Sequence, residues 1–355
     1  MNMDTTESDL RSLLGRSLLQ KYLTHRLLRF VDEQGIVRLL SDMQRFDIED
    51  IAAALQLELG YNLQDGTRYR MVKLLIDLLF ECDFLENEDG FFLWKRAKYP
   101  ELRISEDEAG LAKTVFKGQI DFFEECISYS DKFLRGSPPL YNFDAAAINV
   151  WEKFLGNAEY RFARSVLVRL LLSGRRKQTN VLDLCYGPGF DIPLLQEQAP
   201  DVRVTALDHT DIFLRQASGR IPNPESVQWI DAESWKGFGS PLPFRDCAFD
   251  SVLFTCADPY VPPEVRERFY REIYRVLKPG GALGILTRSF PDAQRKYVKD
   301  PWVRRGVFCH DFTESVCKGW YGFYDAGESE DLFQSNGYIL NTVILNGAVW
   351  RLDRP

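Results

Sequence analysis

The pattern of hydrophobic and polar positions changes about halfway along the chain. Up to residue 174, apolar residues recur at the three- and four-residue spacing of amphipathic helices, as in "LLQKYLTHRLLRFVDEQGIVRLL". Three such helices lead to "FLENEDGFFLW", where Asp89-Gly90 predicts the tight turn of a hairpin. Helices followed by a hairpin are the order of a winged-helix unit. Longer helices are expected after the hairpin, over residues 108–134, 144–155 and 158–173.

From residue 180 onward, short apolar runs alternate with amphipathic helices. Five of these runs predict strands: "NVLDLC", "VRVTALD", "SVQWIDA", "FDSVLFTC" and "ALGILT". Strands that alternate with helices are typical of a doubly wound parallel sheet. Near the C-terminus, "YILNTVIL" and "AVWRLD" are joined at Asn346-Gly347, and strands joined so closely pair antiparallel. We therefore expect an α/β fold with a Rossmann-like, doubly wound seven-stranded sheet that ends in an antiparallel hairpin.

This change of pattern, in a chain of 355 residues, predicts two domains. We expect a helical, winged-helix-like domain over residues 1–165 and an α/β domain over residues 166–355. No apolar run approaches eighteen residues, so no transmembrane helix is expected. The first residues, "MNMDTTESDLRSLL", lack the basic-then-apolar order of a secretion signal, which favours a cytoplasmic protein.

Charge and cysteine usage disfavour a nucleic-acid partner and a metal site. The formal net charge is −8 and the predicted hairpin is acidic, which disfavours nucleic acid and leaves a packing or dimerisation role for the winged-helix-like unit. The seven cysteines are scattered singly and there are only three histidines, so no metal site is expected. Unpaired cysteines fit a reducing compartment.

The stretch "VLDLCYGPGFDIPLL", residues 181–195, predicts a strand, a glycine turn and the start of a helix. This arrangement forms a cradle for a nucleotide-like ligand. A P-loop would need a Lys-Ser or Lys-Thr pair after the glycines, and that pair is missing. A dinucleotide site would prefer a third glycine, which is also missing. S-adenosyl-L-methionine (SAM) is the third candidate ligand.

Several motifs, in order, resemble those of the class I SAM-dependent methyltransferases. "VLDLCYGPG" resembles the first motif, "TALD" the end of the second strand, and "WIDAES" the third-strand motif. "SPLPFRDCAFDSVLF" and "VLKPGGAL" resemble the approach to the fourth strand and the turn before the fifth. The antiparallel C-terminal hairpin is a further mark of the family. The resemblance covers about 175 residues and implies that SAM is the cofactor.

The resemblance assigns roles to particular residues. Asp183 would stand near the cationic head of SAM, and Gly187 and Gly189 would let the ligand approach the backbone. Asp208 would accept hydrogen bonds from the two ribose hydroxyls, because a carboxylate offers two acceptor oxygens. Asp231 would accept from the adenine amino group, with Ala232 packed nearby. The residues expected to bind the donor are Asp183, Cys185, Tyr186, Gly187, Gly189, Asp208, His209, Asp231, Ala232 and Thr255. Cys185 departs from the family, which usually has glycine there.

The N-terminal half resembles, more weakly, that of the multidomain O-methyltransferases of small-molecule metabolism. This resemblance implies a homodimer in which the helical domain covers the site, and a small apolar or aromatic substrate. Those enzymes use a histidine just after the fourth strand as general base, whereas this chain has Pro259 at about that position. Substitutes are Asp258, Tyr260 and His310, the last beside Asp311.

Absence of the usual base favours an acceptor that needs little deprotonation. We expect methyl transfer to carbon, or to an oxygen or nitrogen that is already ionised. Two other classes of protein remain open. One is a SAM-binding enzyme that does not methylate, and the other is a regulator that uses the winged-helix-like unit.

Overall fold

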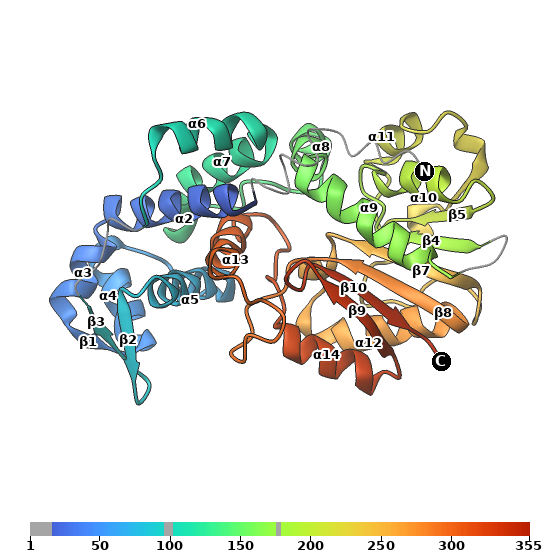
Figure 1. The fold of residues 1–355 in the computed structure, drawn as a ribbon. Helices are drawn as coiled ribbons and strands as arrows, with labels where there is room; N and C mark the ends of the chain where they lie inside the picture. Colours follow the sequence, from blue (N-terminus) through green and yellow to red (C-terminus); the bar gives the residue numbers. More distant parts are fainter. Residues whose placement is uncertain (1–15, 96–101, 175–178) are drawn as a thin grey trace. The chain divides into compact units, whose positions relative to one another are not determined.

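The computed structural model describes residues 16–95, 102–174 and 179–355. They divide into two compact units (Figure 1). The first comprises residues up to Asn142 together with Lys299–Gly322, and the second comprises Phe143–Val298 and Phe323–Pro355. The sequence placed the boundary after residue 165, whereas the chain changes unit after Asn142 and returns to the first unit for one later segment.

The first unit is built mainly from helices. Its elements are α2 (Arg16–Glu33), α3 (Ile36–Met43), β1 (Arg45–Phe46), α4 (Ile48–Leu59), α5 (Gly66–Glu81), β2 (Leu85–Glu88), β3 (Phe91–Trp94), α6 (Glu106–Val115), α7 (Lys117–Leu134) and α13 (Pro301–Glu314). Strands β2 and β3 form the expected hairpin, and β1 pairs antiparallel with β3. Asp89 and Gly90 both take positive φ angles at the turn. That this unit is a winged helix stays a prediction.

Helix α13 completes the first unit, although it follows most of the α/β sheet in sequence. It packs against α2, α5 and α7. Gly306 permits the close approach of α2, because a Cβ there would lie 1.5 Å from the Gln20 side-chain oxygen. Arg304 and Glu81 form an ion pair of 3.0 Å in which both side chains are 8% exposed. This segment therefore belongs to the core of the helical unit.

The second unit contains the expected doubly wound sheet, in the order β6-β5-β4-β7-β8-β10-β9. Its strands are β4 (Asn180–Leu184), β5 (Arg203–Leu207), β6 (Val227–Trp229), β7 (Phe249–Thr255), β8 (Leu277–Leu286), β9 (Ile339–Ile344) and β10 (Val349–Asp353). The first five of these pair in parallel, and β10 pairs antiparallel with both β8 and β9. The antiparallel hairpin turns at Asn346 and Gly347, both with positive φ.

Helices cover both faces of this sheet (Figure 1). They are α8 (Ile148–Leu155), α9 (Ala158–Leu172), α10 (Asp191–Gln198), α11 (Leu214–Gly219), α12 (Pro263–Val276) and α14 (Ala326–Ser335). Helix α9 packs on β8 and β10, where the missing side chain of Gly284 admits Leu167. This packing explains the misplaced boundary, since α8 and α9 belong with the sheet rather than with the helices before them.

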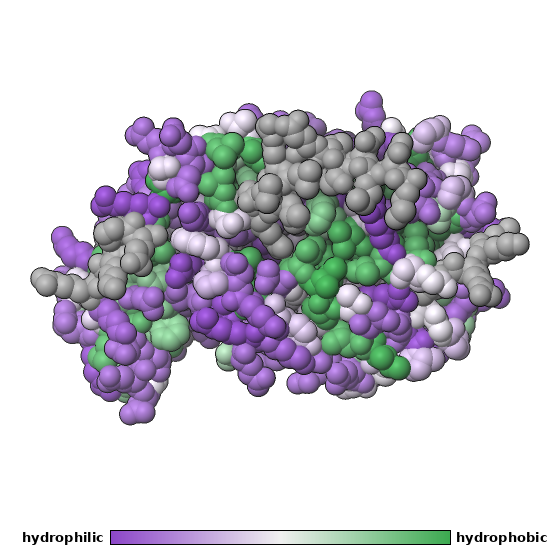
Figure 2. All heavy atoms as spheres, in the orientation of Figure 1, coloured by the Kyte–Doolittle hydropathy of each residue, from purple (hydrophilic) through white to green (hydrophobic). Residues whose placement is uncertain are grey.

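The surface shown in Figure 2 is largely hydrophilic, with apolar side chains gathered in separate areas. Across the described residues, the large apolar side chains that are most exposed are Leu57, Phe80, Leu111, Leu214, Tyr321 and Ile339. None of the described helices is both long and apolar enough to cross a bilayer.

Candidate functional site

The glycine turn lies at the carboxyl end of β4, with β5 on one side and β7 on the other. Ligands of doubly wound sheets bind in the crevice at such a point, where the chain runs to opposite sides from neighbouring strands. Gly187 and Gly189 have φ angles of 48° and 75°, and the amide of Gly189 donates to the Tyr186 carbonyl over 2.8 Å. A Cβ on Gly189 would lie 2.5 Å from the Ala217 Cβ, so α11 rests directly on the turn.

Arg220 holds this turn from outside. Its Nε donates to the Pro188 carbonyl over 2.7 Å, and its Nη2 donates to Glu152 Oε1 over 2.6 Å. The guanidinium also lies over the Phe190 ring, 3.8 Å from the ring centre. One side chain thus connects α8, the turn and the end of α11. No sequence pattern predicted this contact.

Asp208, at the end of β5, faces the same turn. Its Oδ2 accepts from the Gly187 amide over 3.0 Å, and its Oδ1 accepts from the His209 amide over 2.8 Å. The His209 Nδ1 lies 3.0 Å from Oδ1, and this hydrogen bond raises the pKa of the imidazole. Oδ2 keeps a further lone pair, so the group can also accept from a ligand hydroxyl. The structure therefore brings together Gly187, Asp208 and His209, three of the residues expected to bind the donor.

Asp183 is fully buried within β4, and neither of its oxygens has a hydrogen-bond partner in the described part of the chain. Burial raises the pKa of this carboxyl well above its usual range, and the carboxylates of Asp191 and Asp208 raise it further, while Arg164 opposes them. A buried carboxyl without donors is costly unless something pairs with it. The residues present thus fit a ligand that brings a cationic or N–H group to this position.

Arg164 and Asp191 form a buried pair next to the glycine turn. Asp191 begins α10 and accepts from the Thr255 hydroxyl over 2.6 Å, and its Oδ1 lies 3.4 Å from the Arg164 Nε. Arg164 also donates to the Leu155 carbonyl over 2.6 Å. The hydroxyl of Thr255, an expected donor-binding residue, is therefore directed at Asp191. Neither Arg164 nor Asp191 was predicted from the sequence, because their partners lie on other elements.

Cys185, the first residue of the turn, takes a left-handed backbone conformation with φ 60°. Its amide donates to the Leu207 carbonyl over 2.7 Å, which ties the turn to β5. Positive φ favours glycine, which gives a physical reason for the glycine usual in the family. Burial raises the pKa of the Cys185 thiol well above its usual range, so this sulfur stays protonated and weakly nucleophilic.

The remaining expected donor contacts lie along the same edge. Asp231 follows β6 and caps a short 3₁₀ helix, Ala232–Ser234, by accepting from the Glu233 amide over 2.8 Å. The Tyr186 ring is buried and lies edge-on to Trp229, with ring centres 5.3 Å apart. The carboxyl ends of β4, β5 and β6 thus present one continuous row of predicted residues.

Asp258 and Tyr260 occupy a 3₁₀ turn, Asp258–Tyr260, just after β7. Asp258 is buried, and its two oxygens each accept from Arg266 over 3.1 Å. The Tyr270 hydroxyl donates to it over 2.7 Å. The carboxylate therefore fixes the turn after β7. Tyr260 is half-buried, with its ring 4.9 Å from that of Phe143.

His310 lies on α13, so it belongs to the first unit and not to the unit of Asp258 and Tyr260. It is 1% exposed, and its Nε2 lies 2.7 Å from Glu314 Oε2. Its ring meets that of Phe123 edge-on at 4.9 Å. The neighbouring Asp311 does not orient it, since Asp311 accepts from the Trp320 indole and pairs with Arg70.

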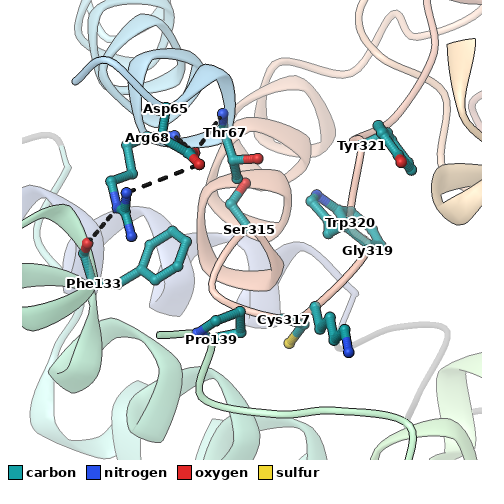
Figure 3. A pocket seen from close by; sticks show the side chains of 11 residues that line it. Asp65, Thr67, Arg68, Phe133, Pro139, Ser315, Cys317, Gly319, Trp320 and Tyr321 are labelled. Atoms are coloured by element: carbon teal, nitrogen blue, oxygen red, sulfur yellow. Dashed lines mark hydrogen bonds and ion pairs between the residues drawn. The ribbon is translucent and has the colours of Figure 1, made fainter. Parts of the chain in front are cut away.

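The first unit also contains a cavity of about 250 Å³ (Figure 3). It is lined by Asp65, Thr67, Arg68, Phe133, Pro139, Ser315, Cys317, Lys318, Gly319, Trp320 and Tyr321. Arg68 donates to the carbonyls of Phe133 and Ser137, and Asp65 caps α5 by accepting from the Thr67 and Arg68 amides. These polar groups are held by the protein itself, unlike Asp183. No group of three His, Cys, Asp or Glu side chains in the described ranges is placed to hold a metal ion.

Comparison with known proteins finds a family model that matches the part of the chain with this geometry. The family described as a methyltransferase domain matches residues 181–281. The demethylmenaquinone methyltransferase of Listeria welshimeri is 34% identical over 118 residues, which are 33% of this chain and 48% of that protein. The chain thus spans about half the length of the curated relatives it matches.

Two solved structures resemble nearly the whole chain. The DszA carbon methyltransferase has a TM-score of 0.63 at 15% identity, over 98% of this chain and 93% of that one. An O-methyltransferase family 2 protein from Planctomyces limnophilus, in complex with apigenin, has a TM-score of 0.59 at 10% identity, over 100% and 98%. At these identities the likeness shows the fold. Residues 181–281 thus match a methyltransferase domain, and the chain shares its fold with these two structures.

Proposed function

We propose that the protein transfers a methyl group from SAM to a small apolar or aromatic metabolite, at carbon or at an oxygen or nitrogen that is already ionised. The observation that carries the proposal is Asp183, a buried carboxyl with no partner in the described structure, directly before the glycine turn. An enzyme of the EC 2.1.1 class that uses SAM binds a donor with an ammonium group, and Asp183 is a matching partner for that group.

The donor would be held along the row of strand ends. SAM, when bound, supplies a methyl group on a positively charged sulfur. Asp183 would pair with its ammonium group, and the glycine turn would leave room for the ligand against the backbone. Asp208 would accept from the ribose hydroxyls, with Oδ2 as the oxygen that keeps a free lone pair. Asp231 would accept from the adenine amino group beside Ala232, and Cys185, Tyr186, His209 and Thr255 would complete the surroundings.

Asp258 is poorly suited to remove a proton from the acceptor. Asp258 already accepts from Arg266 and Tyr270, so taking a proton there would break a buried ion pair. Tyr260 and His310 stay as proposed alternatives, with Glu314 as the partner of His310. An acceptor that arrives ionised or is methylated at carbon removes the need for any of these groups. Names among the relatives, a demethylmenaquinone methyltransferase and a carbon methyltransferase, support this choice.

The helical unit is proposed to form the homodimer and to cover the acceptor, as the weaker resemblance implies. A cytoplasmic location is proposed because no disulfide joins the cysteines of the described residues, which are Cys82, Cys126, Cys185, Cys247, Cys256, Cys309 and Cys317. Light scattering after size-exclusion chromatography tests the dimer, and a monomeric mass would reject it.

The test of the function has two parts. Titration calorimetry with S-adenosylhomocysteine should show binding that Asp208→Ala weakens at least tenfold. Asp201→Ala, an exposed carboxylate that precedes the same strand, should leave binding unchanged. Labelled SAM offered with carbon, nitrogen and oxygen acceptors should then give a labelled product with release of S-adenosylhomocysteine. Unchanged binding in Asp208→Ala, or transfer that requires both an un-ionised alcohol and His310, would contradict the proposal.

A further inference from the structure

Arg288 is a buried cation that the donor site does not use. It follows β8 and is 6% exposed. Its Nη2 lies 3.1 and 3.0 Å from the two oxygens of Glu159, and the Tyr160 hydroxyl is also close to the guanidinium. Its Nε and Nη1, which carry three N–H groups, have no hydrogen-bond partner in the part of the chain that the structure describes. Because arginine does not lose its charge, these donors are costly to leave unpaired.

A second buried arginine of this unit has more of its N–H donors engaged than Arg288 has. Arg266 uses both Nε and Nη2 on Asp258, and its Nη2 also reaches the Ser329 hydroxyl. That guanidinium is engaged along one whole side and fixes the turn after β7. Arg288 has a single anchoring carboxylate at one nitrogen. Glu159 thus holds the side chain in place while most of its donors stay available.

Arg288 lies just beyond the carboxyl end of β8, next to the carboxyl end of β7. Leu286 pairs with Thr255 of β7, and Phe254 of β7 pairs with Leu184 of β4, so Arg288 leaves the sheet at the same edge as the glycine turn. Neighbouring strands lie about 4.8 Å apart, which puts β8 about 10 Å from β4. Most of the expected donor contacts extend from β4 the other way, over β5 and β6, and the hydroxyl of Thr255 on β7 is already directed at Asp191. The ends of β7 and β8 are therefore left for the acceptor.

We propose that Arg288 binds an oxyanion of the methyl acceptor through Nε and Nη1, so that the acceptor is a small molecule with an ionised phenol, enol or carboxylate group. This inference rests on the proposed function and narrows its substrate class. A guanidinium beside the acceptor oxygen favours its ionised form, which replaces the missing general base.

The charges balance in the transfer step. The acceptor's electron pair forms a bond to the methyl carbon while the carbon–sulfur bond breaks and its electron pair stays on sulfur. The sulfonium becomes neutral S-adenosylhomocysteine, and the oxyanion becomes a neutral methyl ether, ester or ketone. For attack through a ring carbon, the proton on that carbon leaves to solvent afterwards.

The test compares three probes of one shape on the full chain, with S-adenosylhomocysteine bound. They are 1-naphthol, 1-naphthoate and 1-methoxynaphthalene, and the last cannot ionise. Calorimetry should show that wild type binds 1-naphthol or 1-naphthoate at least tenfold more tightly than the methyl ether. Preference for naphthol assigns a phenol or enol acceptor, and preference for naphthoate assigns a carboxylate.

Variants then test whether Arg288 causes the tighter binding of the ionisable probes. Arg288→Met should abolish it while binding of the methyl ether stays within twofold, and Arg288→Lys should restore part of it. Arg351→Met, which removes an arginine from β10, is the matched control and should keep the preference. Equal binding of all three probes by wild type, or an undiminished preference in Arg288→Met, overturns the inference. A parallel loss of S-adenosylhomocysteine affinity in Arg288→Met also overturns it, whereas failure of wild type to bind S-adenosylhomocysteine rejects the proposed function itself.

Discussion

At the scale of single residues, the ionised form of Asp183 places a cost on the fold that either a proton or a ligand relieves. The folded protein holds the proton of this carboxyl more tightly than the unfolded chain does, because burial and neighbouring carboxylates raise its pKa. Below the ordinary pKa of about 3.8, the protonated carboxyl therefore contributes its full share to the stability of the folded protein. This contribution is lost as the pH rises through the raised pKa of the folded state. Residues that serve binding commonly carry such a cost.

Asp183→Asn should remove this dependence. The amide has the same shape but cannot ionise, so we expect its melting temperature to exceed that of wild type by about 2–6 °C at pH 8, a shift typical of 1–2 kcal/mol. The difference should shrink as the pH falls toward 4. Thermal unfolding measured by circular dichroism from pH 4 to pH 8 checks this, and a constant difference across that range would show that ionisation of Asp183 is not its cause.

Donor affinity should depend on pH for the same reason. An ammonium group beside Asp183 favours the ionised carboxylate, so binding releases a proton while the free protein is still protonated there. Affinity for S-adenosylhomocysteine should rise with pH above the ordinary carboxyl pKa of about 3.8 and level off above the raised pKa of the folded state, by about tenfold per unit at most. Calorimetry in two buffers with different ionisation enthalpies measures the proton release. Asp183→Asn is the control and should show weak binding with a flat pH profile.

Much of the residue-level site was predictable because its members follow strands in sequence. Asp183, Gly187 and Asp208 each lie at or next to a strand end, and parallel strands bring such ends together. Arg164 and Arg288 were not predictable, because each acts on a partner from another element. The sequence also could not show that Asp258 is engaged by Arg266 and Tyr270, since that depends on how α12 packs.

At the scale of elements, the glycine turn is held between α8 and α11 by Arg220. The side chain connects Glu152, the Pro188 carbonyl and the Phe190 ring. Because Pro188 has no amide hydrogen, its carbonyl is the backbone polar group that can fix the middle of this turn. The conformation offered to the donor thus depends on a contact from outside the motif.

Arg220→Ala should weaken binding of S-adenosylhomocysteine roughly tenfold, since a hydrogen bond from a charged donor contributes about 1.5–3 kcal/mol. Arg220→Lys should recover part of the loss, and the rate at saturating donor should change little. The control is Arg271→Ala, which removes an exposed pair with Glu267 on α12. A similar loss in both variants, measured by calorimetry, would mean that Arg220 contributes only surface charge.

At the scale of the whole molecule, segments that are far apart in sequence pack in the same unit. Strand and helix periodicity was sufficient to predict the seven-stranded sheet and its antiparallel end. The same reasoning assigned residues 299–322 to the sheet domain, because sequence proximity was the only guide. Helix α13 buries polar residues such as His310 and Asp311, so its helical face shows no clear apolar stripe. Asp311 is paired with Arg70 of α5, and His310 with Glu314 of the same helix, and these contacts accompany the burial.

The helical unit should therefore not fold from its N-terminal part alone. A fragment of residues 1–142 lacks α13 and exposes the apolar faces of α2, α5 and α7, so we expect weak near-ultraviolet circular dichroism and broad thermal unfolding. The same fragment joined to residues 299–322 by a Gly-Ser linker should unfold cooperatively. Cooperative unfolding of the shorter fragment would show that α13 is dispensable.

The chain passes from one unit to the other three times, after Asn142, Val298 and Gly322. Recombination between relatives at one point near residue 143 would combine a helical unit from one parent with the α13 of the other. Such hybrids would carry a mismatched interior, for instance at Gly306 against Gln20. Exchange of acceptor preference by transplanting the helical unit thus requires two inserted pieces, and natural variants of this architecture should inherit both together.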